Sequence, residues 1–205
     1  VHQFNAQDLS NVALALSQLG HTPELAWQES FVRRCVEQLP ECGAQGVANL
    51  AQGLAHGGWQ LTPELLRHLA AASLPLLPEC TPHALASLAG AFSLAKYAPP
   101  REWQQAFFYA SRGRLGDANL TDATHWLEAS QRLRLEAPGG WLAETAALVR
   151  QLAWRKSTPT AELVRALHAL TLLASQHMGH SRGPAAGGEG AQASSQPGAA
   201  GTRDR

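Results

Sequence analysis

A repeat of about 38 residues constrains the fold of this chain more than any other feature. The segment Leu39-Pro40-Glu41-Cys42 recurs as Leu77-Pro78-Glu79-Cys80. A second pattern recurs at the same spacing, and its three copies are Leu9, Asn11, Ala13 and Leu16; Val47, Asn49, Ala51 and Leu54; and Leu85, Ser87, Ala89 and Phe92. Further copies start near Thr121 and near Thr158. We therefore expect about five copies of one structural unit.

Within each copy the apolar residues follow the period of an α-helix. Leu9, Val12, Ala13, Leu16 and Leu19 form one apolar stripe at helical spacing. Glycines that can end a helix follow the first two such stripes, at Gly20 and at Gly57-Gly58. The pattern predicts helices near 7–20, 23–38, 44–57, 63–74, 82–96, 100–114, 120–134, 140–155 and 159–176, and strand signals are absent.

Four threonine–proline pairs are predicted to begin helices: Thr22-Pro23, Thr62-Pro63, Thr81-Pro82 and Thr158-Pro159. A threonine hydroxyl can accept a hydrogen bond from the first turn, and proline at the first helical position loses no hydrogen bond. Each repeat is thus predicted to be a helical hairpin.

A hairpin of this size cannot bury its apolar face alone, so we expect residues 1–178 to form an all-α stack, an alpha-solenoid. Trp27, Trp103 and Trp141 lie near the starts of second helices and are expected to pack between repeats. Residues 179–205 contain no Ile, Leu, Val, Phe, Trp, Tyr or Met, which predicts a disordered linker or tail.

Composition excludes several classes of protein. The 16 basic and 16 acidic residues balance, so no overall positive field indicates a nucleic-acid binder. Three cysteines without a C-x-x-C pair favour a reducing compartment. No apolar run is long enough to cross a membrane. Because the chain starts at Val1, inside the repeat pattern, we expect it to be a piece of a longer protein whose targeting segment is not present.

Two motifs resemble those of octotricopeptide repeats, best known from green algae and related to the repeats that precede the RAP domain in FAST-kinase-like mitochondrial proteins. One is the second-helix opening Pro99-Pro100-Arg101-Glu102-Trp103, of which Pro100 and Trp103 recur as Pro138 and Trp141. The other is the run 8–20, with its Leu-x-Asn-x-Ala-x-x-Leu pattern. The resemblance covers residues 4–176. It is weaker in the fourth repeat, where Glu128 and Gln131 lie near positions expected to be apolar.

The resemblance implies a single-stranded RNA-binding protein that acts in chloroplast or mitochondrial gene expression, stabilising, processing or promoting translation of a transcript. A RAP domain is not visible in this sequence. The alternative is a scaffold for protein interactions, such as a component of an organellar ribonucleoprotein particle. The neutral net charge favours this alternative, whereas the repeat pattern favours RNA.

Signs of catalysis are weak, and we expect no enzyme, no cofactor, no metal site and no small-molecule substrate. Gly179-His180-Ser181-Arg182-Gly183 matches G-x-S-x-G, but that motif needs a strand before it. The nine histidines include no H-E-x-x-H motif, and His177 with His180 is expected at a fraying helix end. Cys42 and Cys80 share a repeat position, about one helix-packing distance of 10 Å apart and beyond the reach of a disulfide.

Two groups of residues are candidates for RNA contact. One polar position recurs on the first helices, as helical repeats that read one base each would require, although the solvated face of a helix gives the same pattern. Its members are Asn11, Asn49, Ser87, His125 and Arg165. Basic residues of the second half could contact phosphates. They are Arg112, Arg114, Arg132, Arg134, Arg150, Arg155 and Lys156, and interspersed glutamates leave an ordinary charged surface as the alternative.

Overall fold

The computed structural model describes residues 1–155 and 158–181, with the backbone alone for 178–181. Over these residues the chain forms helices and turns and no strand, which confirms the all-α prediction. The helices are α1 (Ala6–Gln18), α2 (Leu25–Gln38), α3 (Ala44–His56), α4 (Pro63–Ser73), α5 (Pro82–Leu94), α6 (Arg101–Gly113), α7 (Leu120–Arg132), α8 (Gly139–Ala153) and α9 (Thr160–Ser181). Short 3₁₀ turns, η1 (Leu39–Glu41) and η2 (Leu74–Glu79), follow α2 and α4.

The helix starts follow the sequence period. The odd-numbered helices α1, α3, α5 and α7 begin at Ala6, Ala44, Pro82 and Leu120, each exactly one repeat length after the one before. The even-numbered helices begin at Leu25, Pro63, Arg101 and Gly139, in the same steps. Helix α9 starts at Thr160, two residues later than the period would place it.

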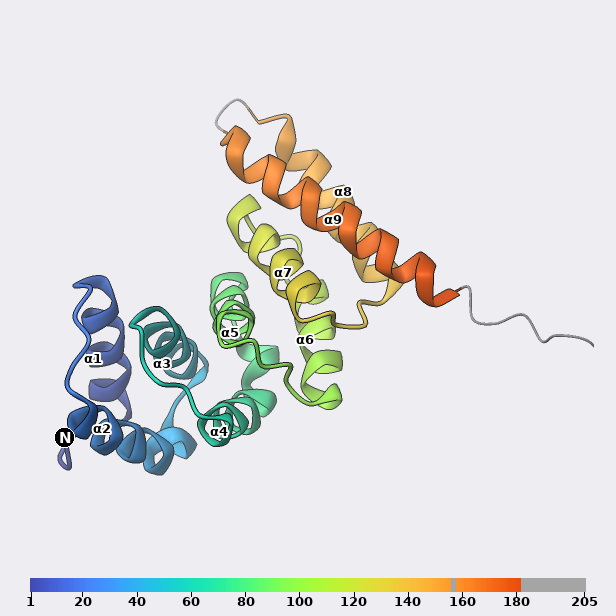
Figure 1. Cartoon of the computed structure of the whole chain (residues 1–205). Helices are drawn as coiled ribbons and strands as arrows, with labels where there is room; N and C mark the ends of the chain where they lie inside the picture. The colour runs from blue at the N-terminus through green and yellow to red at the C-terminus, as the bar shows by residue number, and fades with distance from the viewer. Residues whose placement is uncertain (156–157, 182–205) are drawn as a thin grey trace, which may run out of the picture.

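The helices form two layers along a curved row. Each odd-numbered helix packs on the next, from α1 through α9, and this row lies on the inner side of the curve (Figure 1). Helices α2, α4 and α6 lie along the outer side (Figure 1). This arrangement is compatible with a helical solenoid.

Tryptophans join successive even-numbered helices, as the sequence predicts. The indole nitrogen of Trp103 donates to the hydroxyl of Ser73 at 2.8 Å, and that of Trp141 donates to Ser111 at 2.9 Å. Both indoles are fully buried. Trp27 stacks on Phe31 of its own helix, and its contact with the next repeat is with Trp59, at 5.9 Å between ring centroids. The two indole–serine pairs combine a large apolar contact with a satisfied polar group, and so fix the position of one repeat on the next.

The predicted helix starts are correct at two of the four threonines. The hydroxyls of Thr62 and Thr81 accept from the amides of Leu65 and Ala84. The prediction is wrong at Thr22, whose hydroxyl donates to the carbonyl of Gly57 while α2 begins at Leu25. It is also wrong at Thr158, which donates to the carbonyl of Leu152. In both places a carbonyl of another segment binds the hydroxyl that would have capped the helix.

Four of the odd-numbered helices, α1, α3, α5 and α7, are each followed by a left-handed residue at one repeat position. Gly20 and Gly58 have φ of 64° and 70°, and Lys96 and Arg134 have φ of 52° and 51°. Each of these four positions lies one repeat length after the one before. At three of these turns the amide after the left-handed residue closes the helix end: those of His21, Tyr97 and Leu135 donate to the carbonyls of Leu16, Phe92 and Ser130. Glycine adopts this conformation freely, whereas a residue with a Cβ is strained in it.

The strain at Lys96 gives a stability prediction. We expect Lys96→Gly to raise the free energy of unfolding by up to about 1 kcal/mol, because the left-handed conformation costs a non-glycine residue roughly that much or more. Gly58→Ala at the equivalent turn should lower it by about 1 kcal/mol. Urea denaturation measures both variants, and a destabilised Lys96→Gly protein would contradict this account of the turn.

One close approach between inner helices depends on a glycine. A Cβ at Gly53 of α3 would lie 2.5 Å from the carbonyl carbon of Ala13 and 2.6 Å from the amide nitrogen of Leu14, both in α1. At Gly90, in α5, an added Cβ meets no atom within 4 Å. These two helical glycines are therefore present for different reasons.

This difference predicts opposite effects of one substitution. Gly53→Ala should destabilise the protein by about 1–3 kcal/mol, since the added methyl group forces α1 and α3 apart. Gly90→Ala should stabilise it by up to about 1 kcal/mol, because alanine favours the helix and finds open space. Thermal unfolding of both variants beside the parent protein checks the pair, and equal shifts in one direction would refute it.

The predicted tail can be compared only at its start. Helix α9 continues to Ser181, so the backbone of 179–181 is helical where disorder was predicted. The G-x-S-x-G motif consequently begins in the last turn of a helix and not after a strand. The remainder of the predicted tail, 182–205, lies outside the described residues.

Candidate functional site

The five predicted readout residues occupy one structural position. Each is the sixth residue of its odd-numbered helix, counted from the start of α1, α3, α5, α7 and α9. They are Asn11, Asn49, Ser87, His125 and Arg165. Because these helices pack on one another in order, the five residues form a series across the inner layer. Residues at one repeat position in the sequence therefore occupy equivalent positions on successive helices.

The first two members of this series are held in the same way. The side-chain amide of Gln7 donates to Asn11 Oδ1 at 3.0 Å, and that of Gln45 donates to Asn49 Oδ1 at 2.7 Å. In both pairs the glutamine precedes the asparagine by one helical turn. The amide nitrogen of each asparagine is left as a hydrogen-bond donor.

Two other members contact neighbouring helices. Ser87 of α5 donates to Gln52 Oε1 of α3 at 3.0 Å. Arg165 of α9 donates twice to the carboxylate of Glu128 in α7, at 2.8 and 2.6 Å. This fork geometry is the strong form of an ion pair, and it connects the last two inner helices.

Glu128 and His125 have shifted pKa values. Burial raises the pKa of the Glu128 carboxyl, but the hydrogen bonds and positive charge of Arg165 outweigh burial, and the net shift is downward. The pKa of His125 falls below 6.5, mainly through burial and secondarily through the charge of Arg165, against the opposing charges of Glu128, Glu162 and Asp122. At neutral pH the site therefore holds a carboxylate and a neutral imidazole.

A pocket of about 210 Å³ opens on this inner face. It is lined from α3 by Gln52 and His56, from α5 by His83, Ala86, Ser87, Gly90, Ser93 and Leu94, from α7 by His125, Glu128, Ala129 and Arg132, and from α9 by Arg165. It thus brings together Ser87, His125 and Arg165 of the readout series with Arg132 of the phosphate series. Asn11 and Asn49 lie outside it.

Several lining residues were not predicted as site residues. Gln52 and Glu128 share one repeat position with Gly90, since they lie one repeat length before it and one after it. This position lies three residues after the readout series, on the same helical face. The 38-residue spacing of Gln52, Gly90 and Glu128 is the signal in the sequence that indicates them.

The predicted phosphate-contact residues do not share one surface. Arg112 of α6 pairs with Glu144 of α8, its Nε donating at 2.7 Å. Arg114 donates to the carbonyl of Pro78. Arg150 lies on α8 and Arg155 after it, and Lys156 lies outside the described residues. Arg132, at the end of α7, is the member that lines the pocket on the inner face, 3.9 Å from Glu128.

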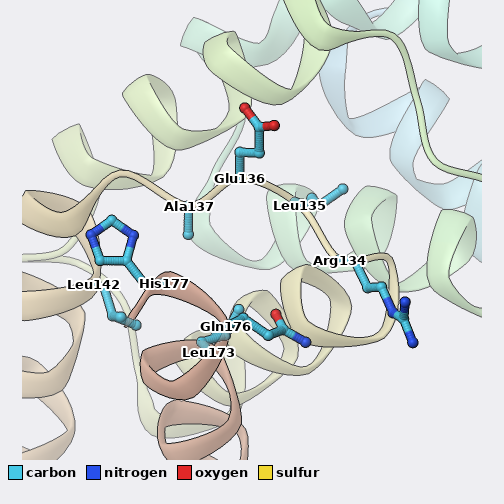
Figure 2. A pocket seen from close by; sticks show the side chains of 8 residues that line it. All are labelled: Arg134, Leu135, Glu136, Ala137, Leu142, Leu173, Gln176 and His177. Carbon is cyan, nitrogen blue, oxygen red and sulfur yellow. The ribbon is translucent and has the colours of Figure 1, made fainter. Parts of the chain in front are cut away.

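A larger pocket of about 730 Å³ lies between the α7–α8 turn, α8 and the end of α9. Leu135, Ala137, Leu142 and Leu173 provide apolar surface there. Figure 2 shows the carboxylate of Glu136 and the guanidinium of Arg134 pointing away from each other. Glu136 is also paired with Arg101, at 2.8 Å. The charged groups do not converge here as they do on the inner face, so the smaller pocket is the better candidate.

Other kinds of chemistry find little support among the described residues. No group of three or more histidine, cysteine or acidic side chains there is arranged to hold a metal ion. Cys35, Cys42 and Cys80 are buried and unpaired with one another, and burial raises the pKa of Cys80 to about 11. None of the described helices combines the length and apolar character that a membrane crossing needs.

Comparison with known proteins adds no assignment. No protein-family model matches the sequence, and no curated protein matches it.

The lowered pKa of His125 predicts how stability depends on pH. As pH falls below 6.5, the unfolded chain binds a proton at this imidazole before the folded protein does, so the folded state loses stability. His125→Asn should therefore lose less stability than the parent protein between neutral pH and about pH 5. His21→Asn, in an exposed turn, is the matched control. Parallel pH profiles for the parent and His125→Asn proteins would contradict the assignment.

Proposed function

We propose that this chain is a single-stranded RNA-binding protein of the octotricopeptide type, with five repeats, acting in chloroplast or mitochondrial gene expression. The observation that carries the proposal is the series of hydrogen-bonding side chains at the sixth residue of each inner helix. Helical repeats that read RNA place a few side chains at fixed repeat positions, one base for each repeat. The organelle and the repeat family rest on the sequence resemblance.

The chemistry of the series suits bases. An amide, a hydroxyl, an imidazole and a guanidinium can each form hydrogen bonds with base edges, and the type of side chain changes from repeat to repeat. A position that served only to solvate the helix would not need Gln7 and Gln45 to orient Asn11 and Asn49 in the same way. Asn11 and Asn49 are therefore oriented alike, while Ser87 and Arg165 contact neighbouring helices, so the repeats present different groups at one position.

Charge on the inner face is local and not continuous. Glu128 binds Arg165 through two hydrogen bonds, whereas its nearest contact with Arg132 is 3.9 Å, longer than a hydrogen bond. The side chain of Arg132 is 55% exposed, so its charge is available to a phosphate. We therefore assign Arg132 the first phosphate contact of the proposed surface. A few such contacts, not a strongly positive protein, would hold the strand.

The test measures the affinity of this protein for random single-stranded RNA and compares it with that of two variants. The two variants should lose different properties of binding. Arg132→Ala should weaken binding to all sequences and reduce the slope of log affinity against log salt by about 0.7. Asn49→Ala should change the preferred base at one position by about 1–3 kcal/mol and leave the salt slope unchanged. Arg67→Ala, exposed on α4 in the outer layer, is the control and should match the parent protein.

Failure to bind any RNA at about 50 mM salt, where phosphate contacts are strong, would make the proposal wrong. A protein-interaction scaffold would then be the better assignment. One observation favours that second candidate: Tyr109 on α6 and Trp154 after α8 are 79% and 85% exposed. Exposed aromatic side chains are frequent anchors of protein interfaces.

A further inference from the structure

The pocket on the inner face exists because one helix lacks a side chain at its centre. Gly90 lies in the interior of α5, where glycine costs about 1 kcal/mol relative to alanine. No atom comes within 4 Å of the place where its Cβ would be, so packing between helices does not require glycine there. Gly53, which touches the backbone of α1, is the contrasting case. An unexplained helical glycine beneath an open pocket indicates close approach of something other than the protein's own neighbours.

The helices on either side of α5 carry long side chains at the repeat position of Gly90. At the same repeat position α3 carries Gln52 and α7 carries Glu128, both long and polar. The small side chains of Ala86 and Ala129 line the same pocket. Small residues of α5 and α7 thus line the pocket together with the long polar side chains of Gln52 and Glu128, which suits a flat ring with polar edges.

The pocket contains a buried polar group without a partner. Ser93 is 8% exposed and lines the pocket, and its hydroxyl forms no hydrogen bond with any described residue. A buried hydroxyl in this state is unfavourable by about 1–3 kcal/mol unless something binds it. A ligand with a hydrogen-bonding edge would satisfy it.

Two hydrogen-bond donors of the pocket are unused. The Oε1 atom of Gln52 accepts from Ser87, which leaves its amide nitrogen to donate. The carboxylate of Glu128 accepts two hydrogen bonds from Arg165. At the rim, the guanidinium of Arg132 forms no hydrogen bond within the described part of the chain. A ligand that presents an acceptor to Gln52 and a negative group to Arg132 would use both donors.

We propose that the pocket above Gly90 takes a single nucleotide of the bound RNA, with the base on the Gly90 floor and the phosphate at Arg132. This inference rests on the proposed RNA-binding function. The base would be guanine or uracil, whose carbonyl oxygen stands where adenine and cytosine carry an amino donor. The pocket volume of about 210 Å³ is below the roughly 300 Å³ of pockets that hold drug-sized ligands. A pocket of this size suits a single base. One base would then contact α3, α5 and α7, not one repeat alone.

The experiment fills the pocket from its floor. Gly90→Leu adds a side chain into the open space and favours the helix, so the variant should fold. Gly113→Leu is the matched control, because Gly113 ends α6 in the outer layer and a Cβ there also meets no atom within 4 Å. Circular dichroism and melting temperature verify folding, and Gly90→Ala supplies a smaller filling if the leucine variant unfolds.

Each protein is titrated with an RNA selected by the parent chain and with copies carrying one abasic nucleotide at each position in turn. The parent chain and Gly113→Leu should show one position where loss of the base weakens binding by about 5- to 150-fold, the range for a well-formed base contact. Adenine or cytosine at that position should weaken binding similarly. Gly90→Leu should bind the intact strand more weakly and be insensitive to the base there.

The outcomes separate this inference from the function on which it rests. If the parent chain binds no RNA, both are overturned. If Gly90→Leu keeps the affinity and base preference of the parent chain, or if the preferred base at the sensitive position is adenine or cytosine, the pocket inference is wrong and RNA binding stands. Titration of the parent chain with the abasic series requires no variant, so a misfolded Gly90→Leu protein does not remove the test.

Discussion

Close packing between successive inner helices is the interaction on which the rest of this structure depends. It uses small residues at one repeat position: Gly53 in α3, Ala91 in α5 and Ala129 in α7, all buried. The backbone of α3 approaches that of α1 so closely that even a methyl group at Gly53 would not fit. Because the helices are held at this fixed separation, side chains one turn away fall into register across the layer. The readout series and the pocket both follow from that register.

The sequence predicted the helices well because their signals are local. Apolar spacing, glycines and prolines placed most helix ends within two or three residues. The predictions failed where a distant partner decided the outcome. Thr22 could not be recognised as a donor to Gly57 without knowing that these turns meet in space. Helix α9 ends at Ser181, later than the predicted 176, because the prediction ended the helix with the apolar pattern.

The candidate site was predictable in part for the same reason. A polar position that repeats with the helix period can be read from one chain, and the structure places its members in one layer. Among the predicted arginines only Arg112 and Arg150 lie one repeat length apart. The surroundings of the group are set by partners such as Glu144, which lies on a different helix from Arg112. The pocket was invisible in the sequence because it is produced by a missing side chain. Gly90 has no side chain where the neighbouring helices carry Gln52 and Glu128, and only the packing of the helices brings these three residues to one pocket.

The side-chain hydrogen bonds that join different helices share one range of sequence separation. Among the described residues they span between 30 and 41 positions, from Trp103 with Ser73 to Thr121 with Glu162. Each hairpin is thus tied to its immediate neighbour and not to remote parts of the chain. Such a molecule resembles a one-dimensional lattice in its folding: order can start at any hairpin and spread outward, and loop closure stays equally short at every step. Unfolding should accordingly begin by fraying at an end of the stack, while the central hairpins around α5 remain ordered longest.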